Sequence, residues 1–260
     1  MSVDKEVVTN EQLVYSRSHR DSRDRAVHLS VGYSPNHSIF FLQRGHIYDK
    51  YERMKGKRWD DHYTRRARSE KWLARSVYKL QEIDKKFKLI HRNNRLLDLG
   101  CYPGSWSQYG IQKVGPKGEV AGIDLIRPDR LSSPSFRFIQ ADVCALGIEW
   151  LNQELRPIDV VMSDLAPQTT GIKTVDISRS MLLATRAAEI AIALLEKNGH
   201  FVCKVFEGEN LISFRSSVSA HFRTIRLFRP VATRKGSREI YLVGLGLIKQ
   251  QIIDSVPSPL

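Results

Sequence analysis

The chain has 260 residues, of which 42% are hydrophobic and 27% charged, and it carries a net charge of +13 with a pI near 9.8. This composition allows a sizeable core, and the sequence contains neither a run of about 18 apolar residues nor a signal peptide, which argues against a membrane protein. Three cysteines without paired spacing argue against a disulfide framework and a cysteine metal site, and they indicate a reduced, cytoplasmic protein.

The positive charge favours a polyanionic partner, most simply nucleic acid. It is concentrated in two segments. Residues 50–79 contain eleven lysines and arginines against four acids, a net of +7, and residues 223–238 contain six more basic residues. A solvated basic surface could have this composition. However, the first segment ends at Lys79 and the second ends just before Glu239. Both of these are candidate site residues, so the basic charge adjoins a candidate site, and this favours a functional groove.

The ends of the chain differ in character from its middle. Residues 1–53 are polar and weakly patterned, which predicts a flexible or weakly ordered extension. Domain-like sequence then runs over residues 54–248, and residues 249–260 predict a loose tail. We therefore expect one domain with two appendages, and a monomer.

Within that domain, strands alternate with helices. From about residue 69 the spacing of Leu73, Val77, Leu80 and Phe87 predicts an amphipathic helix. Later apolar runs predict strands at 95–99, 119–124, 136–140, 158–163, 200–206, 224–228 and 239–247, with helices near 106–114, 147–155, 176–197 and 210–221. This order predicts a doubly wound α/β sheet, whose last two strands form an antiparallel pair at an edge.

The turn after the first predicted strand indicates a ligand site. It reads Asp98-Leu-Gly-Cys-Tyr-Pro-Gly104, and its glycines allow close approach to a ligand at the carboxyl edge of the sheet. Asp124 and Asp142 lie at the ends of the next two strands, where carboxylates suit ribose hydroxyls and an adenine amino group. A carboxylate disfavours a pyrophosphate here but suits S-adenosylmethionine, which carries an ammonium and a sulfonium. Alternatively, Asp98 bonds the loop backbone.

Four charged residues stand in apolar or otherwise constrained contexts: Lys79, Asp164, Lys204 and Glu239. Lys204 is the most unusual of the four in its context, because it is a charged residue within the otherwise apolar run Phe-Val-Cys-Lys-Val-Phe. A lysine buried in a strand needs a carboxylate partner, which points to a site, whereas a lysine at a strand end can extend its ammonium to solvent. Taken alone, the residue leaves both interpretations open.

In chain order, six motifs resemble those of the FtsJ/RrmJ family of ribosomal RNA 2′-O-ribose methyltransferases over roughly residues 57–247. They are Arg-Ser-Val-Tyr-Lys79-Leu, Leu-Asp-Leu-Gly-x-x-Pro-Gly104-x-Trp106-Ser-Gln, Ser-Asp164-Leu-Ala-Pro, Asp176-Ile-x-Arg, Lys204-Val-Phe-x-Gly-Glu and Ser-Arg-Glu239-Ile-Tyr. Each is weak alone, but together and in this order they are specific.

The resemblance implies the S-adenosylmethionine-dependent methyltransferase fold, a Rossmann-like seven-stranded and mostly parallel sheet with helices on both faces. It implies that the cofactor is lined by Gly104, Trp106, Asp124, Asp142 and Asp164. It also implies a tetrad of Lys79, Asp164, Lys204 and Glu239 around the target ribose, in which we expect Lys204 to be the principal proton acceptor. One departure is Ser105, where the bacterial family usually has glycine.

The substrate implied by the resemblance is the A-loop uridine of 23S ribosomal RNA in the large ribosomal subunit. Transfer RNA is an alternative substrate, and a ribosome-assembly factor that binds RNA without turnover is an alternative function. A base methyltransferase would want an aromatic residue after the Asp164 segment or a nucleophilic cysteine near it. Neither is present, and Cys203 should point away from Lys204 by strand alternation.

Overall fold

The computed structural model describes residues 62–155, 157–168 and 170–248. The predicted extension (residues 1–53), the domain boundary at residue 54 and the predicted tail (residues 249–260) lie outside the described residues. Within the described residues, no helix is long and apolar enough to cross a membrane.

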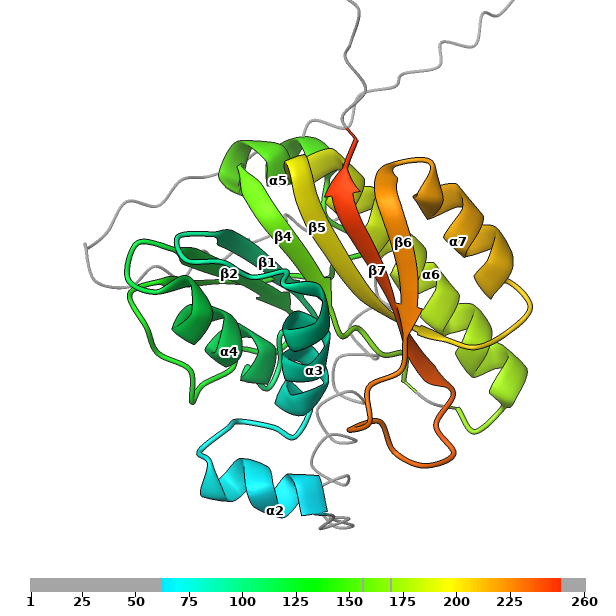
Figure 1. Cartoon of the computed structure of the whole chain (residues 1–260), viewed down its shortest axis with the longest axis horizontal. Helices are drawn as coiled ribbons and strands as arrows, with labels where there is room; N and C mark the ends of the chain where they lie inside the picture. The colour runs from blue at the N-terminus through cyan, green and yellow to red at the C-terminus, as the bar shows by residue number, and fades with distance from the viewer. Residues whose placement is uncertain (1–61, 156, 169, 249–260) are drawn as a thin grey trace, which may run out of the picture. The chain divides into compact units, whose positions relative to one another are not determined.

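Seven strands form one mixed sheet (Figure 1). They are β1 Arg95–Leu99, β2 Glu119–Asp124, β3 Phe136–Gln140, β4 Ile158–Ser163, β5 Leu195–Phe206, β6 Phe222–Phe228 and β7 Glu239–Leu247, in the order β3-β2-β1-β4-β5-β7-β6. Strands β1 to β5 are parallel, and β7 pairs antiparallel with both β5 and β6. The predicted fold is therefore confirmed, with the antiparallel pair at one edge, where β6 is outermost.

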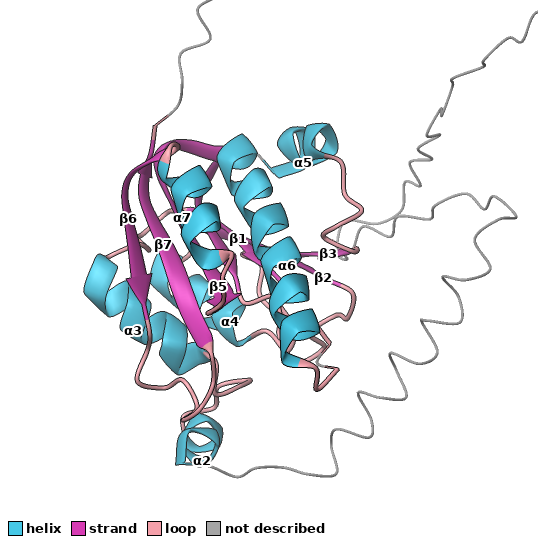
Figure 2. Cartoon of the chain, turned by 90° about the vertical axis from the view of Figure 1, so that its right-hand side faces the viewer, coloured by secondary structure: helices cyan, strands magenta, loops and turns pink. Residues whose placement is uncertain are grey.

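Helices cover both faces of this sheet, as Figure 2 shows. They are α2 His62–Ser69, α3 Val77–Phe87, α4 Ser105–Val114, α5 Ile148–Leu155, α6 Lys173–Leu194 and α7 Leu211–Ser219. Helices α5, α6 and α7 pack on one face and share a core with Leu97, Val161 and Phe201. Helices α3 and α4 pack on the other face, against Leu96 and Val202. Because side chains alternate along each strand, neighbouring residues of one strand supply both cores.

Two predicted boundaries are wrong. The helix predicted from residue 69 is split: α2 ends at Ser69, Lys71 adopts a left-handed φ of 60°, and α3 begins only at Val77. The helix predicted over 176–197 ends at Leu194, and β5 begins at once. The pairing of β4 with β5 then shifts register: Ile158 lies opposite Leu195 and Val160 opposite His200, so residues 196–199 form a bulge in β5.

The strand order places a ligand-binding edge near the middle of the sheet. The chain runs from β1 outward to β3, then returns to β4 on the other side of β1 and continues outward. In open α/β sheets, the crevice at such a reversal, beside the carboxyl ends of the strands, is where ligands bind. The residues that follow β1 and β4 therefore meet at this edge.

Candidate active site

The four predicted tetrad residues converge on one edge of the sheet from four elements. Asp164 follows β4 directly, Lys204 lies near the carboxyl end of β5, and Lys79 lies on α3 above them. Glu239 is the first residue of β7. Because β7 runs antiparallel to its neighbours, its beginning lies at the edge where the parallel strands end, with Glu239 opposite Phe206.

Lys204 and Asp164 form a buried ion pair. The Lys204 Nζ lies 3.2 Å from the Asp164 Oδ1 and donates a hydrogen bond of 2.6 Å to the Asp164 carbonyl oxygen. The Lys204 side chain is only 6% exposed. Of the two interpretations left open by the sequence, the structure therefore supports a buried ammonium paired with a carboxylate, not one that extends to solvent. Burial alone would raise the pKa of Asp164, but the charges of Lys204 and Lys79 and a hydrogen bond from Tyr241 outweigh it and lower that pKa.

A second ion pair closes the other side of the group. The Lys79 Nζ lies 2.7 Å from the Glu239 Oε1, and both side chains are largely buried. The group holds two ammonium and two carboxylate charges, so it is electrically balanced. Balanced pairing is what allows charges to remain in such a poorly hydrated place.

Tyr241 links the two ion pairs, and the sequence analysis missed it. Its hydroxyl lies 2.7 Å from the Asp164 Oδ1 and 3.0 Å from the Glu239 Oε1. Burial, together with the two carboxylates, raises the pKa of Tyr241 well above its usual value, so the hydroxyl keeps its proton. The signal was present: Tyr241 is two residues from Glu239, on the same face of the strand, and the sheet pairs it with Lys204.

Trp106 supports this group from beneath. Its side chain is 2% exposed, and its ring centroid lies 5.8 Å from that of Tyr241. Its indole Nε1 donates a hydrogen bond of 2.9 Å to the Ser76 carbonyl oxygen, just before α3. The indole is therefore a packing element between the glycine loop and the tetrad.

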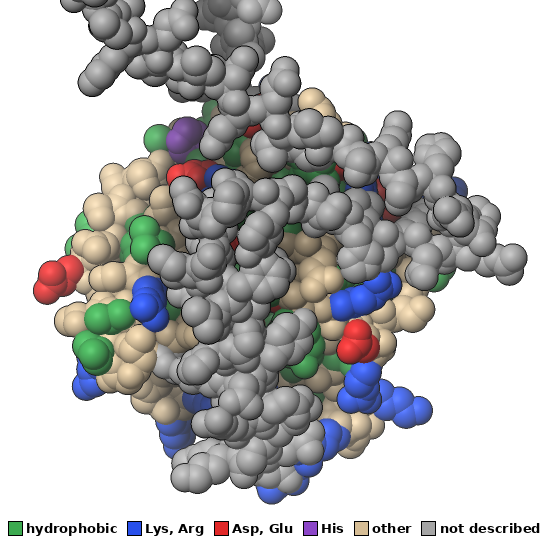
Figure 3. Space-filling view, turned by 180° about the vertical axis from the view of Figure 1, so that it is seen from behind, with side chains coloured by type: hydrophobic (Ala, Val, Ile, Leu, Met, Phe, Trp, Pro, Cys, Tyr) green, Lys and Arg blue, Asp and Glu red, His purple; other side chains and the backbone are tan. Residues whose placement is uncertain are grey.

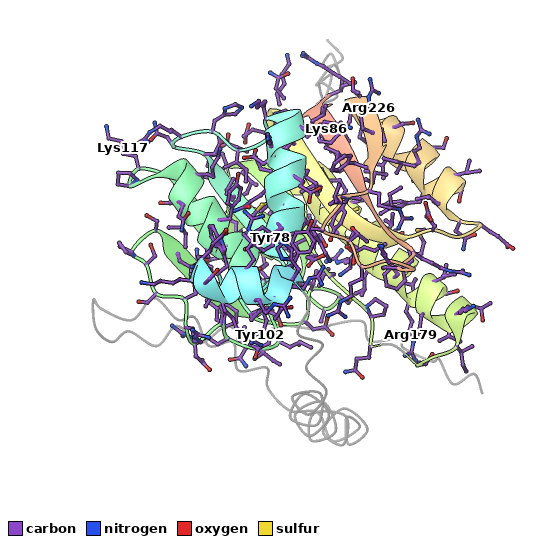
Figure 4. All side chains as sticks on the ribbon, turned by 60° about the horizontal axis from the view of Figure 1, so that its bottom comes forward. Tyr78, Lys86, Tyr102, Lys117, Arg179 and Arg226 are labelled. Carbon is purple, nitrogen blue, oxygen red and sulfur yellow. The ribbon has the colours of Figure 1, made fainter. Side chains whose placement is uncertain are left out.

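The glycine loop has the backbone conformation that its sequence predicts. Gly100 and Gly104 adopt φ values of +77° and +105°, in the left-handed region that disfavours side chains. A Cβ at Gly104 would also lie 2.9 Å from a methyl carbon of Leu73. Tyr102, at the loop's centre, is more than one third exposed, and Figure 4 places it at the margin of the molecule.

Asp98 lies behind this loop and is fully buried. Its Oδ2 accepts a hydrogen bond of 2.6 Å from the Ser107 hydroxyl, and its Oδ1 has no partner among the described residues. Burial raises the pKa of Asp98 to about 7, with the hydrogen bond from Ser107 opposing the shift and the charges of Asp164 and Asp124 adding to it. The bond that Asp98 receives comes from the following helix, not from the loop backbone.

Asp124 and Asp142 lie beyond the same loop. Asp124 ends β2 and accepts hydrogen bonds from the amides of Tyr102 and Ile126, at 2.9 and 3.1 Å, and burial raises its pKa against these bonds. Asp142 follows β3 by two residues, is exposed, and accepts from the Cys144 amide at 2.9 Å. The carboxyl ends of β1, β2 and β3 thus carry acids, as the sequence predicts.

Ser105, the departure from the family pattern, directs its hydroxyl toward α3. Its Oγ lies 2.8 Å from the Ser76 Oγ, and the residue is 2% exposed. The hydroxyl therefore joins the glycine loop to the element that carries Lys79.

Cys203 lies on the opposite face of the sheet from Lys204. It packs in the core beneath α5, α6 and α7, and burial raises the pKa of its thiol. The predicted orientation by strand alternation is confirmed, and a buried thiol on the far face is not placed to attack a substrate at the tetrad.

Comparison with known proteins shows the family of this chain. Residues 72–247 match the FtsJ-like methyltransferase family. "Ribosomal RNA large subunit methyltransferase E" of Desulfatibacillum aliphaticivorans is 46% identical over 191 residues, covering 73% of this chain and 92% of that protein. The protein of the same name from Bdellovibrio bacteriovorus is 46% identical over 188 residues, covering 71% and 95% respectively.

A solved structure is also similar. A Plasmodium falciparum protein described as a ribosomal RNA methyltransferase superimposes with a TM-score of 0.60 at 26% identity, covering 69% of this chain and all of that one. The match in sequence, the shared fold and the order of the motifs lead to one conclusion: this chain belongs to the FtsJ-like methyltransferase family.

Proposed function

We propose that the protein transfers a methyl group from S-adenosylmethionine to a ribose 2′-hydroxyl of RNA. The observation that carries the proposal is the continuous buried network of Lys79, Glu239, Tyr241, Asp164 and Lys204, beside an acid-lined glycine loop. Its two cations suit a nucleotide, and its position at the switch point suits a reaction between two bound molecules.

The residues around the loop fit this cofactor. Left-handed glycines remove side chains where a ligand would approach, and the polar groups beside them are carboxylates, which suit a ligand with an ammonium and a sulfonium. We assign Gly104, Trp106, Asp124, Asp142 and Asp164 to cofactor contacts, as the family resemblance implies. When bound, the cofactor supplies a methyl group already activated by its sulfonium.

The protein's own contribution is alignment and proton removal. A 2′-hydroxyl is a weak nucleophile, so its oxygen must be held in line with the methyl carbon while its proton leaves. We assign proton acceptance to Lys204, whose ammonium must first release a proton to solvent; the amine then takes the proton of the 2′-hydroxyl, and Asp164, 3.2 Å away, stabilises the ammonium that forms again. Lys79 and Glu239 position the ribose and its neighbouring phosphate.

The proposed substrate is large-subunit ribosomal RNA, and within it the A-loop uridine. Support comes from the names of the similar bacterial proteins and from the basic residues around the site. Such a substrate implies a cytoplasmic enzyme, and we expect it to act as a monomer. Transfer RNA is the competing substrate.

The test is transfer of a tritiated methyl group to isolated large subunits, free ribosomal RNA and transfer RNA, followed by mapping of 2′-O-methylated nucleotides. We expect labelling of one large-subunit nucleotide. Lys204→Ala should abolish transfer while cofactor affinity, measured by equilibrium dialysis, is retained. Near-full turnover by Lys204→Ala would refute the assignment of the proton acceptor.

Two further variants sharpen this test. Lys204→Arg keeps the positive charge but cannot give up its proton, so transfer should also be lost if Lys204 is a base. Lys113→Ala is the matched control, because Lys113 also pairs with a buried aspartate, Asp84 at 3.2 Å, away from the tetrad. RNA binding without any transfer by the wild-type protein would favour the assembly-factor alternative.

A further inference from the structure

Polar side chains on α3 and just before it contact a loop from the far end of the chain. Lys79 and Glu82 are three residues apart on α3, which puts them on one side of the helix, and Arg75 lies in the turn before it. We call the segment between β6 and β7 the basic loop (residues 229–238). Arg75 and Glu82 contact this loop, and Lys79 contacts Glu239, the residue that follows it. Figure 1 shows this loop passing beside α3.

Glu82 makes the most specific of these contacts. Its Oε2 accepts a hydrogen bond from the Val231 amide at 2.6 Å, and its Oε1 accepts one from the Ala232 amide at 3.0 Å. Arg75 donates to the carbonyl oxygen of the same Ala232. One carboxylate thus holds two consecutive amides that lie about 150 residues away in the sequence, and charge-assisted bonds of this kind are strong.

Of the two residues that Glu82 bonds, Ala232 is also packed, whereas Val231 is exposed. Ala232 is fully buried in a small apolar cluster with Ala67, Val77 and Tyr78, where α2 meets α3. Figure 4 shows Tyr78 at this junction. The first part of the basic loop, at residues 231–232, is therefore held against α3.

The base of the basic loop is held separately. The Arg229 guanidinium lies 2.6 Å from a carboxylate oxygen of Glu207, and the Glu207 amide donates to the Arg238 carbonyl oxygen at 2.9 Å. Between the two anchors the side chains of Arg234, Lys235 and Arg238 are exposed. The next residue is Glu239, which pairs with Lys79.

We propose that Glu82 is a positioning residue that sets the basic loop for RNA binding. By bonding the loop backbone, Glu82 holds the basic side chains of the loop in one position relative to Lys79 and Glu239. A phosphate bound by these side chains would then place the neighbouring ribose at the tetrad. This deepens the proposed function and rests on it. Preorganisation of this kind improves affinity, because the entropy cost of ordering the loop is not incurred when RNA binds.

The experiment is a double-mutant cycle in RNA affinity. Lys235→Ala alone should weaken binding of a large-subunit RNA fragment about 5- to 10-fold, as loss of one phosphate contact does. Glu82→Ala alone should weaken it about 10-fold, because a released loop presents its cations poorly. In the double variant the two losses should not multiply, since Lys235 contributes only when the loop is seated.

The matched control is Glu149→Ala, which removes an exposed glutamate on α5, away from the loop. In the double variant with Lys235→Ala, the fold-loss of RNA affinity should equal the product of the two single fold-losses, because the two sites are independent. Cofactor affinity should be unchanged in every variant. Multiplicative losses for Glu82→Ala and Lys235→Ala would overturn the proposal, because they would show that Glu82 acts independently of the loop.

A second measurement does not depend on the variants folding. In the wild-type protein, hydrogen exchange at the Val231 and Ala232 amides should be slowed at least 100-fold relative to an unstructured chain. Unprotected amides there would also overturn the proposal. Methyl transfer by the wild type is measured alongside: its absence counts against the proposed function, whereas multiplicative losses with transfer intact count against Glu82 alone.

Discussion

At the scale of single residues, the site is a set of charges that burial would otherwise exclude. Lys204 and Lys79 are each paired with a carboxylate, and Tyr241 lies between the two pairs. A phenol has one proton to donate, yet two carboxylate oxygens lie within hydrogen-bonding distance of it. Tyr241 therefore fixes the spacing of Asp164 and Glu239 more than it neutralises either.

Tyr241→Phe should lower kcat about 10- to 100-fold. A hydrogen bond to a charged group contributes about 1.5–3 kcal/mol, and its loss would let the two acids, and the lysines they hold, move apart. Single-turnover methyl transfer measures the rate, and equilibrium dialysis should show unchanged cofactor affinity.

Tyr109→Phe is the control for this change. The Tyr109 hydroxyl also bonds a buried carboxylate, that of Asp84 at 2.7 Å, but on the outer side of α3 and α4. We expect this variant to lose thermal stability and keep kcat. Equal losses of kcat in both variants would mean that Tyr241 acts only through general stability.

Asp98 gives the protein a pH dependence of known sign. Its pKa is about 7 in the folded protein because of burial, against about 4 for aspartate in an unfolded chain. The folded state thus holds a proton that the unfolded state has released, so the contribution of Asp98 to stability falls as pH rises from about 4 to about 7. Above that window the loss is complete.

Asp98→Asn should remove this part of the pH dependence. Its free energy of unfolding, measured by denaturant titration without cofactor, should rise relative to the wild type between pH 4 and 7 and then stay level. The exposed Asp129, replaced by Asn, serves as the control and should keep a constant difference. A constant difference for Asp98→Asn would contradict the raised pKa.

At the scale of elements, α3 joins the parts of the site. It carries Lys79, its beginning is tied to the glycine loop through Ser76, and Glu82, on the same side of the helix as Lys79, bonds the basic loop. The Ser76–Ser105 contact is the one that the expected glycine at position 105 could not make. In this chain, the Ser105 hydroxyl therefore adds a hydrogen bond between the glycine loop and the start of α3.

Ser105→Ala should therefore destabilise the protein by about 1 kcal/mol, the value of one buried hydrogen bond. Ser105→Gly should cost about 2 kcal/mol, because glycine at the start of α4 adds a loss of chain entropy. Thermal unfolding should rank the wild type above Ser105→Ala and Ser105→Gly last. In a Ser76→Ala background, Ser105→Ala should cost much less; an undiminished effect would disprove the contact.

At the scale of the whole molecule, the net charge of +13 should attract the proposed RNA substrate over long range. Lys and Arg side chains lie along the lower part of the face seen in Figure 3, and the basic loop adds exposed cations beside the site. Long-range attraction of this kind is screened by salt, whereas the buried ion pairs of the tetrad are screened much less.

RNA affinity should accordingly fall steeply with salt, with a linear plot of log affinity against log salt concentration. Lys235→Ala should reduce the slope by about 0.7–0.9, the value for one phosphate contact. Cofactor affinity should change little over the same range, because that ligand has no phosphate. A salt-independent RNA affinity would argue against a polyanion as the partner.

Local signals made much of this protein predictable. The strands β1 to β4 and β7 were predicted with their observed bounds, because each is a short apolar run bordered by turn residues. The positions of Gly104 and of the acids at the ends of β1, β2 and β3 could be predicted because they depend on local backbone structure. The end of α6 was missed because Leu195 continues the helical spacing and Gly199 resembles a helix end, whereas the structure places residues 195–199 in β5.

The sequence by itself determined the doubly wound fold and the identity of the four charged residues. Only the tertiary structure decided that they form one network, since Lys79 and Glu239 are 160 residues apart and meet because β7 runs antiparallel. It also revealed Tyr241 and Glu82, whose sequence contexts are ordinary. Their partners come from distant elements, and burial and hydrogen bonding between such elements leave no local pattern in the chain.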